Sequence, residues 1–153
     1  MLDIYIDADG CPVKDEVFRV AARFKLKVYV VANSPLRVPQ SESIEAVVVK
    51  GGMNIADDWI AERINEGDIA ITTDIPLADR CIQKKAAVLK PNGHPLTEKT
   101  IGHALATREL LQGLRQTGEI TGGPAPFKPA DRSRFLSGLD QIIQSIRRLH
   151  KLT

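Results

Sequence analysis

The 153-residue sequence predicts an α/β fold, a three-layer sandwich around a mostly parallel sheet of about five strands, followed by C-terminal helices. Two observations predict it. Short β-rich runs alternate with segments in which apolar residues recur at helical spacing, as expected for strands joined by helical crossovers. Most of these runs are nearly continuously apolar, which is typical of strands covered on both faces. The expected strands span residues 2–7, 27–32, 45–50, 68–73 and 86–90.

Three helices are expected between these strands. Apolar residues recur at helical spacing after Pro12 up to Phe24, and proline suits the first turn of a helix. Asn54 is a favourable N-cap for a second helix, which Gly67 is expected to end. A third, short helix is predicted to start at Pro76.

The last third of the chain predicts two further helices. One is expected over residues 97–117, and Asp131 is predicted to begin the other, which has one strongly apolar face. The segment between them, TGEITGGPAPFKPAD, is rich in glycine and proline and is predicted to be a loop. We therefore expect one α/β domain over residues 1–153, with 97–153 as a helical extension packed on it or docked on a second copy in a homodimer.

The composition excludes several classes of protein. Hydrophobic residues make up 43% of the chain and charged residues 26%, which is ordinary for a soluble globular domain. No apolar run is long enough to cross a bilayer, and the N-terminus lacks a signal-peptide pattern, so a cytoplasmic protein is expected. Cys11 and Cys81, with three scattered histidines, do not form a zinc framework and are expected to be reduced thiols.

Aspartates gather at one edge of the predicted sheet. The carboxyl ends of parallel strands meet at the same edge, where open α/β sheets bind their ligands. The aspartates are Asp7 and Asp9 after the first strand, Asp57 and Asp58 in the first turn of the second helix, Asp74 after the fourth strand and Asp79 in the third helix.

Each of these acids has a local explanation, because carboxylates are favoured in first helical turns and as turn caps. Four or more on one edge would repel one another without a cation, and oxygen ligands favour Mg²⁺ or Mn²⁺. Asp57 shares a helix face with Ile60 and Ile64, whereas Asp58 faces solvent, so Asp57 is the expected ligand. Ions held in this way can activate water and stabilise the leaving oxygen of a phosphodiester, which predicts a metal-dependent nuclease.

Four stretches of the chain together resemble the YaiI/YqxD family of uncharacterised bacterial proteins: DADGCPVK, ADDWIAERINEGDIAITTDIPLADRCIQKKAAVL, TIGHALATREL and GGPAPFKPADRSRF. The resemblance covers nearly the whole chain. The family in turn resembles PIN-like nuclease domains at a few acidic positions, one of which is commonly glutamate and is Asp57 here. The resemblance implies metal ligation by Asp7, Asp57 and Asp74, with Asp79 as a fourth ligand, and RNA as substrate. Catalysis is expected from Asp7, Asp57 and Asp74 together with Asp9, an extra acid that departs from the PIN-like pattern.

Contacts to the substrate are expected from polar and basic side chains near the same edge. Arg132 and Arg134 belong to a C-terminal tail in which basic residues outnumber acidic ones, although a solvated helix face explains that tail equally well. Lys50 precedes Gly51 and Gly52, a pair that would let a phosphate approach the backbone or would simply make a tight turn. The complete set of expected substrate contacts is Asn33, Arg37, Lys50, Arg132 and Arg134.

Two other functions remain open from the residues. The stretch IDADGCPV resembles the first motif of haloacid-dehalogenase-type phosphatases, which would make Asp7 a nucleophile and Asp9 a general acid, with Cys11 in place of the usual threonine. The other possibility is a non-catalytic module that binds RNA or a partner protein.

Overall fold

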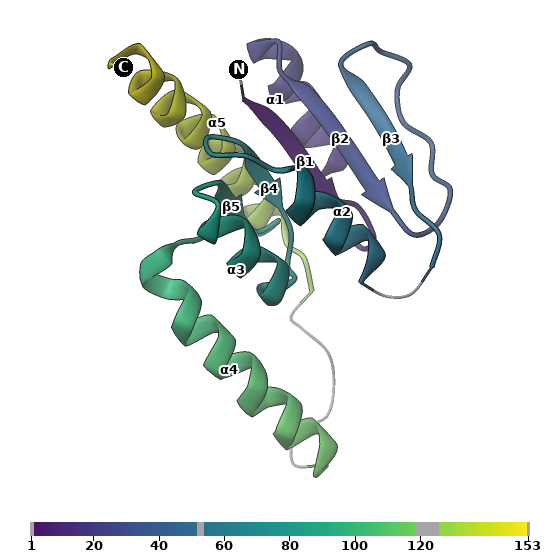
Figure 1. The fold of residues 1–153 in the computed structure, drawn as a ribbon, viewed down its shortest axis with the longest axis vertical. Coiled ribbons are helices and arrows are strands. Elements are labelled where there is room, and N and C mark those ends of the chain that lie inside the picture. The colour runs from purple at the N-terminus through teal and green to yellow at the C-terminus, as the bar shows by residue number, and fades with distance from the viewer. Residues whose placement is uncertain (1, 52–53, 119–125, 153) are drawn as a thin grey trace.

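The computed structural model describes residues 2–51, 54–118 and 126–152 of the chain (Figure 1). Its centre is a six-stranded sheet in the order β3-β2-β1-β4-β5-β6. The first five strands are parallel to their neighbours, and β6 pairs with β5 in the antiparallel sense. The strands are β1 (Asp3–Asp7), β2 (Lys27–Ala32), β3 (Ile44–Val48), β4 (Ile69–Ile71), β5 (Ala87–Leu89) and β6 (Pro95–Leu96).

Helices cover both faces of this sheet, which confirms the predicted α/β architecture. One face carries α1 and α5, and the other carries α2 and α3 (Figure 1). The helices are α1 (Lys14–Phe24), α2 (Ile55–Arg63), α3 (Ile75–Gln83), α4 (Glu98–Gln116) and α5 (Pro129–Leu152).

Strand β1 lies inside the sheet, and its sequence is almost continuously apolar because helices cover both of its faces. Ile4 and Ile6 are fully buried against the side of α1 and α5, whereas Tyr5 packs into the cluster on the side of α2 and α3. Successive side chains of a strand point to opposite faces, so a strand covered twice has no polar face. The same alternation places Asp7 on the side of Tyr5, toward α2 and α3.

Strand lengths differ from those predicted, because polar residues at their ends bind backbone groups outside the ladder. The expected strand over 68–73 shortens to three residues: Asp68 accepts hydrogen bonds from the backbone N–H groups of Asp3 and Asn65, both at 2.9 Å, and so closes its start. Strand β6 was not predicted. It consists of two residues that follow a turn at Gly93, where φ is +89°.

Helix starts and ends also differ from those predicted: α1 begins at Lys14, after Pro12, and α3 begins at Ile75, one residue before Pro76. Asn54 occupies the N-cap position of α2 but makes no side-chain capping hydrogen bond. That helix ends at Arg63 rather than near Gly67, because Ile64 turns to an extended conformation. Helix α5 begins at Pro129, before the predicted Asp131. The predicted loop between α4 and α5 includes residues 119–125, which lie outside the described part of the chain.

The two C-terminal helices differ in how they pack. Helix α5 completes a layer of the domain beside α1, with Phe135, Leu139 and Ile143 fully buried. Helix α4 buries only Ile101 among its residues and extends away from the sheet (Figure 1). No helix in the described ranges has the length and apolar content needed to cross a membrane.

A candidate acidic site at the carboxyl edge of the sheet

Asp7 and Thr72 lie side by side where β1 and β4 end. In the parallel ladder Ile6 pairs with Ile71, so the next residues of the two strands are neighbours on the same face. The Thr72 hydroxyl donates to Asp7 Oδ2 at 2.8 Å and accepts a hydrogen bond from the backbone N–H of Asp74 at 2.9 Å. Thr72 therefore orients the Asp7 carboxylate and links it to the start of α3.

Asp74 is the N-cap of α3. Its Oδ1 accepts a hydrogen bond from the backbone N–H of Leu77 at 2.9 Å, and Pro76 follows in the first turn. A carboxylate at this position satisfies an N–H group that has no partner in the helix and interacts favourably with the helix dipole. Capping holds the Asp74 side chain in place and leaves its second oxygen for other partners.

Asp57 projects into the same site from the first turn of α2, whose residues Ala56 and Ile60 are buried. The pKa of Asp57 is raised to about 7 by burial, by the negative charges of Asp74 and Asp7, and by a hydrogen bond with the Asp74 carboxyl group; Arg80 opposes the shift. The carboxyl group of Asp57 therefore lies close to those of Asp74 and Asp7, and it keeps its proton to a higher pH than an ordinary aspartate does.

The pKa of Asp7 is raised as well. Burial is the largest cause, the charges of Asp74 and Asp9 add to it, and the hydrogen bond from Thr72 acts in the opposite direction. Like charges at one site disfavour ionisation, and an added cation favours it. The carboxyl groups of Asp7, Asp57 and Asp74 thus come from three separate elements and repel one another at one site.

Asp9 has a different setting. It is exposed, and its Oδ2 accepts a hydrogen bond from the backbone N–H of Asn33 at 2.9 Å, which joins the end of β1 to the end of β2. In the phosphatase interpretation Asp9 would donate a proton beside Asp7, whereas here its carboxylate is an acceptor. Its charge still reaches the site, because it raises the pKa of Asp7.

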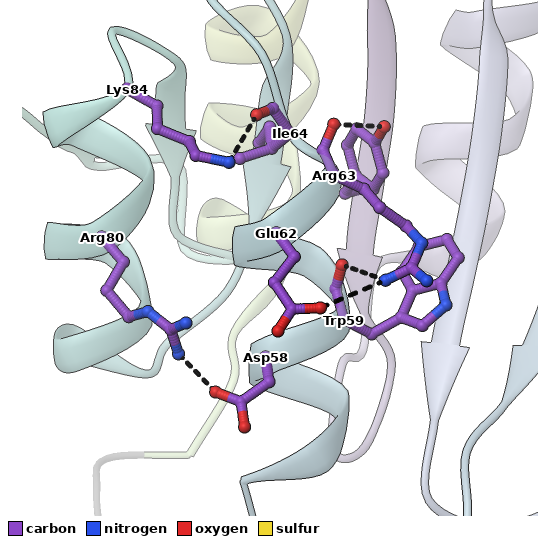
Figure 2. A network of polar contacts seen from close by, with 8 residues as sticks. Asp58, Trp59, Glu62, Arg63, Ile64, Arg80 and Lys84 are labelled. Atoms are coloured by element: carbon purple, nitrogen blue, oxygen red, sulfur yellow. Dashed lines mark hydrogen bonds and ion pairs between the residues drawn. The ribbon is translucent and has the colours of Figure 1, made fainter.

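Two of the predicted acids face away from this site. Asp58 forms an ion pair with Arg80 at 2.6 Å on the outer side of α2 (Figure 2). Asp79 accepts a hydrogen bond from Gln83 Nε2 at 3.2 Å, one turn further along α3. Asp79 is not among the charges that shift the pKa of Asp7 or Asp57. The structure therefore brings together three of the four predicted metal ligands.

The arginines expected to contact substrate hold the start of α5 in place. Arg132 donates to Glu16 Oε1 at 2.5 Å. Arg134 donates to the backbone oxygen of Asn92 at 3.0 Å and to Asp131 Oδ1 at 2.9 Å. Both guanidinium groups are nearly half exposed, so they also present donors to solvent.

The other expected contacts are the exposed residues Arg37 and Lys50. Gly51, which follows Lys50, has φ +133°, and a Cβ there would lie 2.9 Å from Ile55 Cγ1. The positive φ and the close approach of Ile55 therefore account for this glycine. Gly52 lies outside the described residues.

Two residues that shape the site have no role predicted from the sequence. Thr72 lies in the second of the four motif stretches, but no local pattern assigns a role to its hydroxyl group. Lys14 opens α1, and its ammonium group donates to the backbone oxygens of Ala8 at 3.3 Å and Cys11 at 3.0 Å, which closes the loop after β1. A lysine at a first helical position gives no local signal for this contact, because it forms only when the loop folds back.

The carboxyl groups of this site would have to supply the ligands of a bound metal ion. Among the residues that the structure describes, no three histidine, cysteine, aspartate or glutamate side chains are already arranged to hold one. Mg²⁺ usually binds through one or two carboxylates and keeps several waters, so a ready-made cage is not required. Asp57 and Asp74 offer two neighbouring carboxylate ligands, which fit such an ion.

The family model described as "Uncharacterized BCR, YaiI/YqxD family" matches residues 5–145. The chain belongs to the YaiI/YqxD family. A UPF0178 protein of Rhodospirillum centenum is 57% identical over 152 residues, covering 97% of this chain and 99% of that protein. Another, of Paramagnetospirillum magneticum, is 58% identical over 149 residues, with 97% and 99% covered. No solved structure matches the chain.

YaiI/YqxD membership agrees with the resemblance that the sequence motifs indicated. A third relative, from Rhodopseudomonas palustris strain TIE-1, is 59% identical over 145 residues. The alignment covers 95% of this chain and 92% of that relative. The names of these relatives assign no activity, so the function has to be argued from the site.

Proposed function

We propose that the protein is a Mg²⁺- or Mn²⁺-dependent nuclease that hydrolyses phosphodiester bonds, with RNA as its substrate. The observation that carries the proposal is the convergence of Asp7, Asp57 and Asp74 at one edge of the sheet, where the neighbouring negative charges raise the pKa values of Asp57 and Asp7. The choice of RNA comes from the similarity of the acidic positions to those of PIN-like domains.

Each of the three acids has a part in this proposal. Asp57 and Asp74 would act as ligands, and capping of α3 keeps the Asp74 side chain in position. Asp7 is the third oxygen donor, directly or through a water, and the Thr72 hydroxyl sets its orientation. The cation would supply Lewis-acid activation of the phosphate and of the attacking water.

The test is cleavage of a labelled single-stranded RNA in the presence of Mn²⁺, together with calorimetric titration of Mn²⁺. Asp7→Asn and Asp74→Asn should each reduce cleavage by roughly 100-fold or more and weaken Mn²⁺ binding, because each loses a charged ligand. Asparagine is also a good N-cap, so Asp74→Asn should remain folded. Asp58→Asn and Asp79→Asn are matched controls, which should bind and cleave like the wild type.

Three results would reject the proposal. Normal cleavage by both site variants would show that the acids are not required. Hydrolysis of a phosphomonoester, dependent on Asp7 and without cleavage of RNA, would favour the phosphatase. RNA binding in EDTA with no turnover under Mg²⁺ or Mn²⁺ would favour a non-catalytic binding module.

A further inference from the structure

The outer half of α4 presents leucines to solvent. Leu110 is 63% exposed, and Leu111 and Leu114 are partly exposed beside it. These three positions lie within about one third of the helix circumference, since successive residues are about 100° apart. Only the first half of α4, which contains Ile101, packs on the body of the domain, near α3. Helices of this length gain most of their stability from tertiary packing of an apolar face.

A second apolar surface lies at the base of α4. A groove with a volume of about 710 Å³ is formed by the C-terminal part of α5, the β5–β6 region and the beginning of α4. Leu149, at its edge, is 65% exposed. The apolar residues that line the groove include Ile82, Val88, Leu96, Ile142, Ile146 and Leu149.

We propose that these surfaces bind each other in a symmetric homodimer: the leucines of the outer half of α4 of each protomer occupy the groove of its partner. Helix α4 has 19 residues, and a rise of 1.5 Å per residue places Leu110 and Leu114 roughly 20 Å from Glu98, which lines the groove. Two α4 helices running antiparallel about a two-fold axis bring each outer half to the base of the other. Each protomer then makes the same two contacts, so the assembly stops at a dimer and both apolar surfaces are buried.

Charges on the two surfaces are complementary. Arg108 and Arg115 outnumber Glu109 beside the leucines of α4, and Glu66 and Glu98 outnumber Lys85 at the groove. No ion pair in the described part of the chain involves Arg108, Arg115, Glu66 or Glu98. Opposite charges around an apolar centre select the partner and the register more than they add affinity. This chain carries both the leucine surface of α4 and the groove that would bind it. A second copy of the chain is therefore the proposed partner.

The first test is sedimentation of the full-length protein over a range of micromolar concentrations. The wild type should form a reversible dimer, and Leu110→Glu and Leu149→Glu should each weaken self-association by about tenfold or more. Both sites are exposed, so circular dichroism should be unchanged. Val48→Glu is the matched control, because Val48 is an exposed apolar residue on β3 and should leave the dimer intact.

A charge-reversal experiment tests the pairing itself. One variant carries Arg108→Glu and Arg115→Glu, and the other carries Glu66→Arg and Glu98→Arg. Each alone should be monomeric, because helix and groove then carry the same charge, whereas an equimolar mixture should form a heterodimer. A monomeric wild type, a dimer that Leu110→Glu disrupts but Leu149→Glu does not, or a mixture that stays monomeric would each overturn the proposal.

Discussion

The Thr72 hydroxyl lies 2.8 Å from Asp7 Oδ2 and joins two parts of the acidic site. Because Thr72 Oγ1 accepts a hydrogen bond from the backbone N–H of Asp74, the hydroxyl proton of Thr72 is directed at Asp7. The contact favours the charged form of a carboxyl group whose pKa burial raises. Thr72 thus opposes the effects that would keep Asp7 protonated.

Thr72→Val should remove this donor without a large change in volume. The pKa of Asp7 should rise further, and the free energy of unfolding should fall by about 1–2 kcal/mol, as expected for the loss of a part-buried hydrogen bond. If Asp7 binds Mn²⁺, affinity should fall by about 10- to 100-fold, the usual cost of losing a group that orients a ligand. Urea unfolding and Mn²⁺ calorimetry measure the two effects. Thr72→Ser, which keeps the hydroxyl, should behave like the wild type; equal losses in both variants would contradict this role.

Asp57 should make the stability of the metal-free protein fall as pH rises. Its pKa is about 7 in the folded protein and 3.8 as the ordinary value, so the folded state binds more protons between these two values. Stability decreases with pH wherever the folded state holds the extra proton. The midpoint of thermal unfolding should therefore decline between about pH 4 and pH 7 more steeply in the wild type than in Asp57→Asn. An identical slope in the two proteins would show that the pKa of Asp57 is not raised in the folded state.

Glu16 and Arg132 should depend on each other for stability. Glu16 is 5% exposed, and its Oε2 is buried without a hydrogen-bond partner, so the ion pair through Oε1 is its main compensation. Arg132→Met should lower the free energy of unfolding by about 1–3 kcal/mol, less than for a fully buried pair because Arg132 is nearly half exposed. Adding Glu16→Gln should recover part of the loss in denaturant unfolding. If the double variant is less stable than Arg132→Met alone, the buried charge is not the cause.

Gly93 should be less tolerant of substitution than another glycine with positive φ. A Cβ at Gly93 would lie 2.6 Å from the backbone carbon of Arg134, so alanine would force the start of α5 to move. At Gly10, where φ is +77°, no atom lies within 4 Å, and only backbone strain is expected. Gly10→Ala should cost about 1–2 kcal/mol, and Gly93→Ala about 1–3 kcal/mol more because of the clash. Thermal unfolding of the two variants compares them directly; similar losses would contradict the close packing of α5 on this turn.

The sequence by itself determined the alternation of strands and helices, because the period of apolar residues is a local property. It also placed Asp7 and Asp74 on one edge, since both follow predicted parallel strands and parallel strands end together. The helical period was enough to turn Asp57 toward the sheet and Asp58 away from it. These inferences need only neighbouring residues and the rules of parallel sheets.

Only the tertiary structure decided which groups actually touch. The Thr72–Asp7 hydrogen bond joins residues 65 positions apart, and the raised pKa of Asp57 depends on how α2 packs beside α3. The same packing leaves Asp79 apart and makes α5, but not the outer half of α4, part of the core. Such contacts are set by strand register and helix placement, which depend on the whole core rather than on any local pattern.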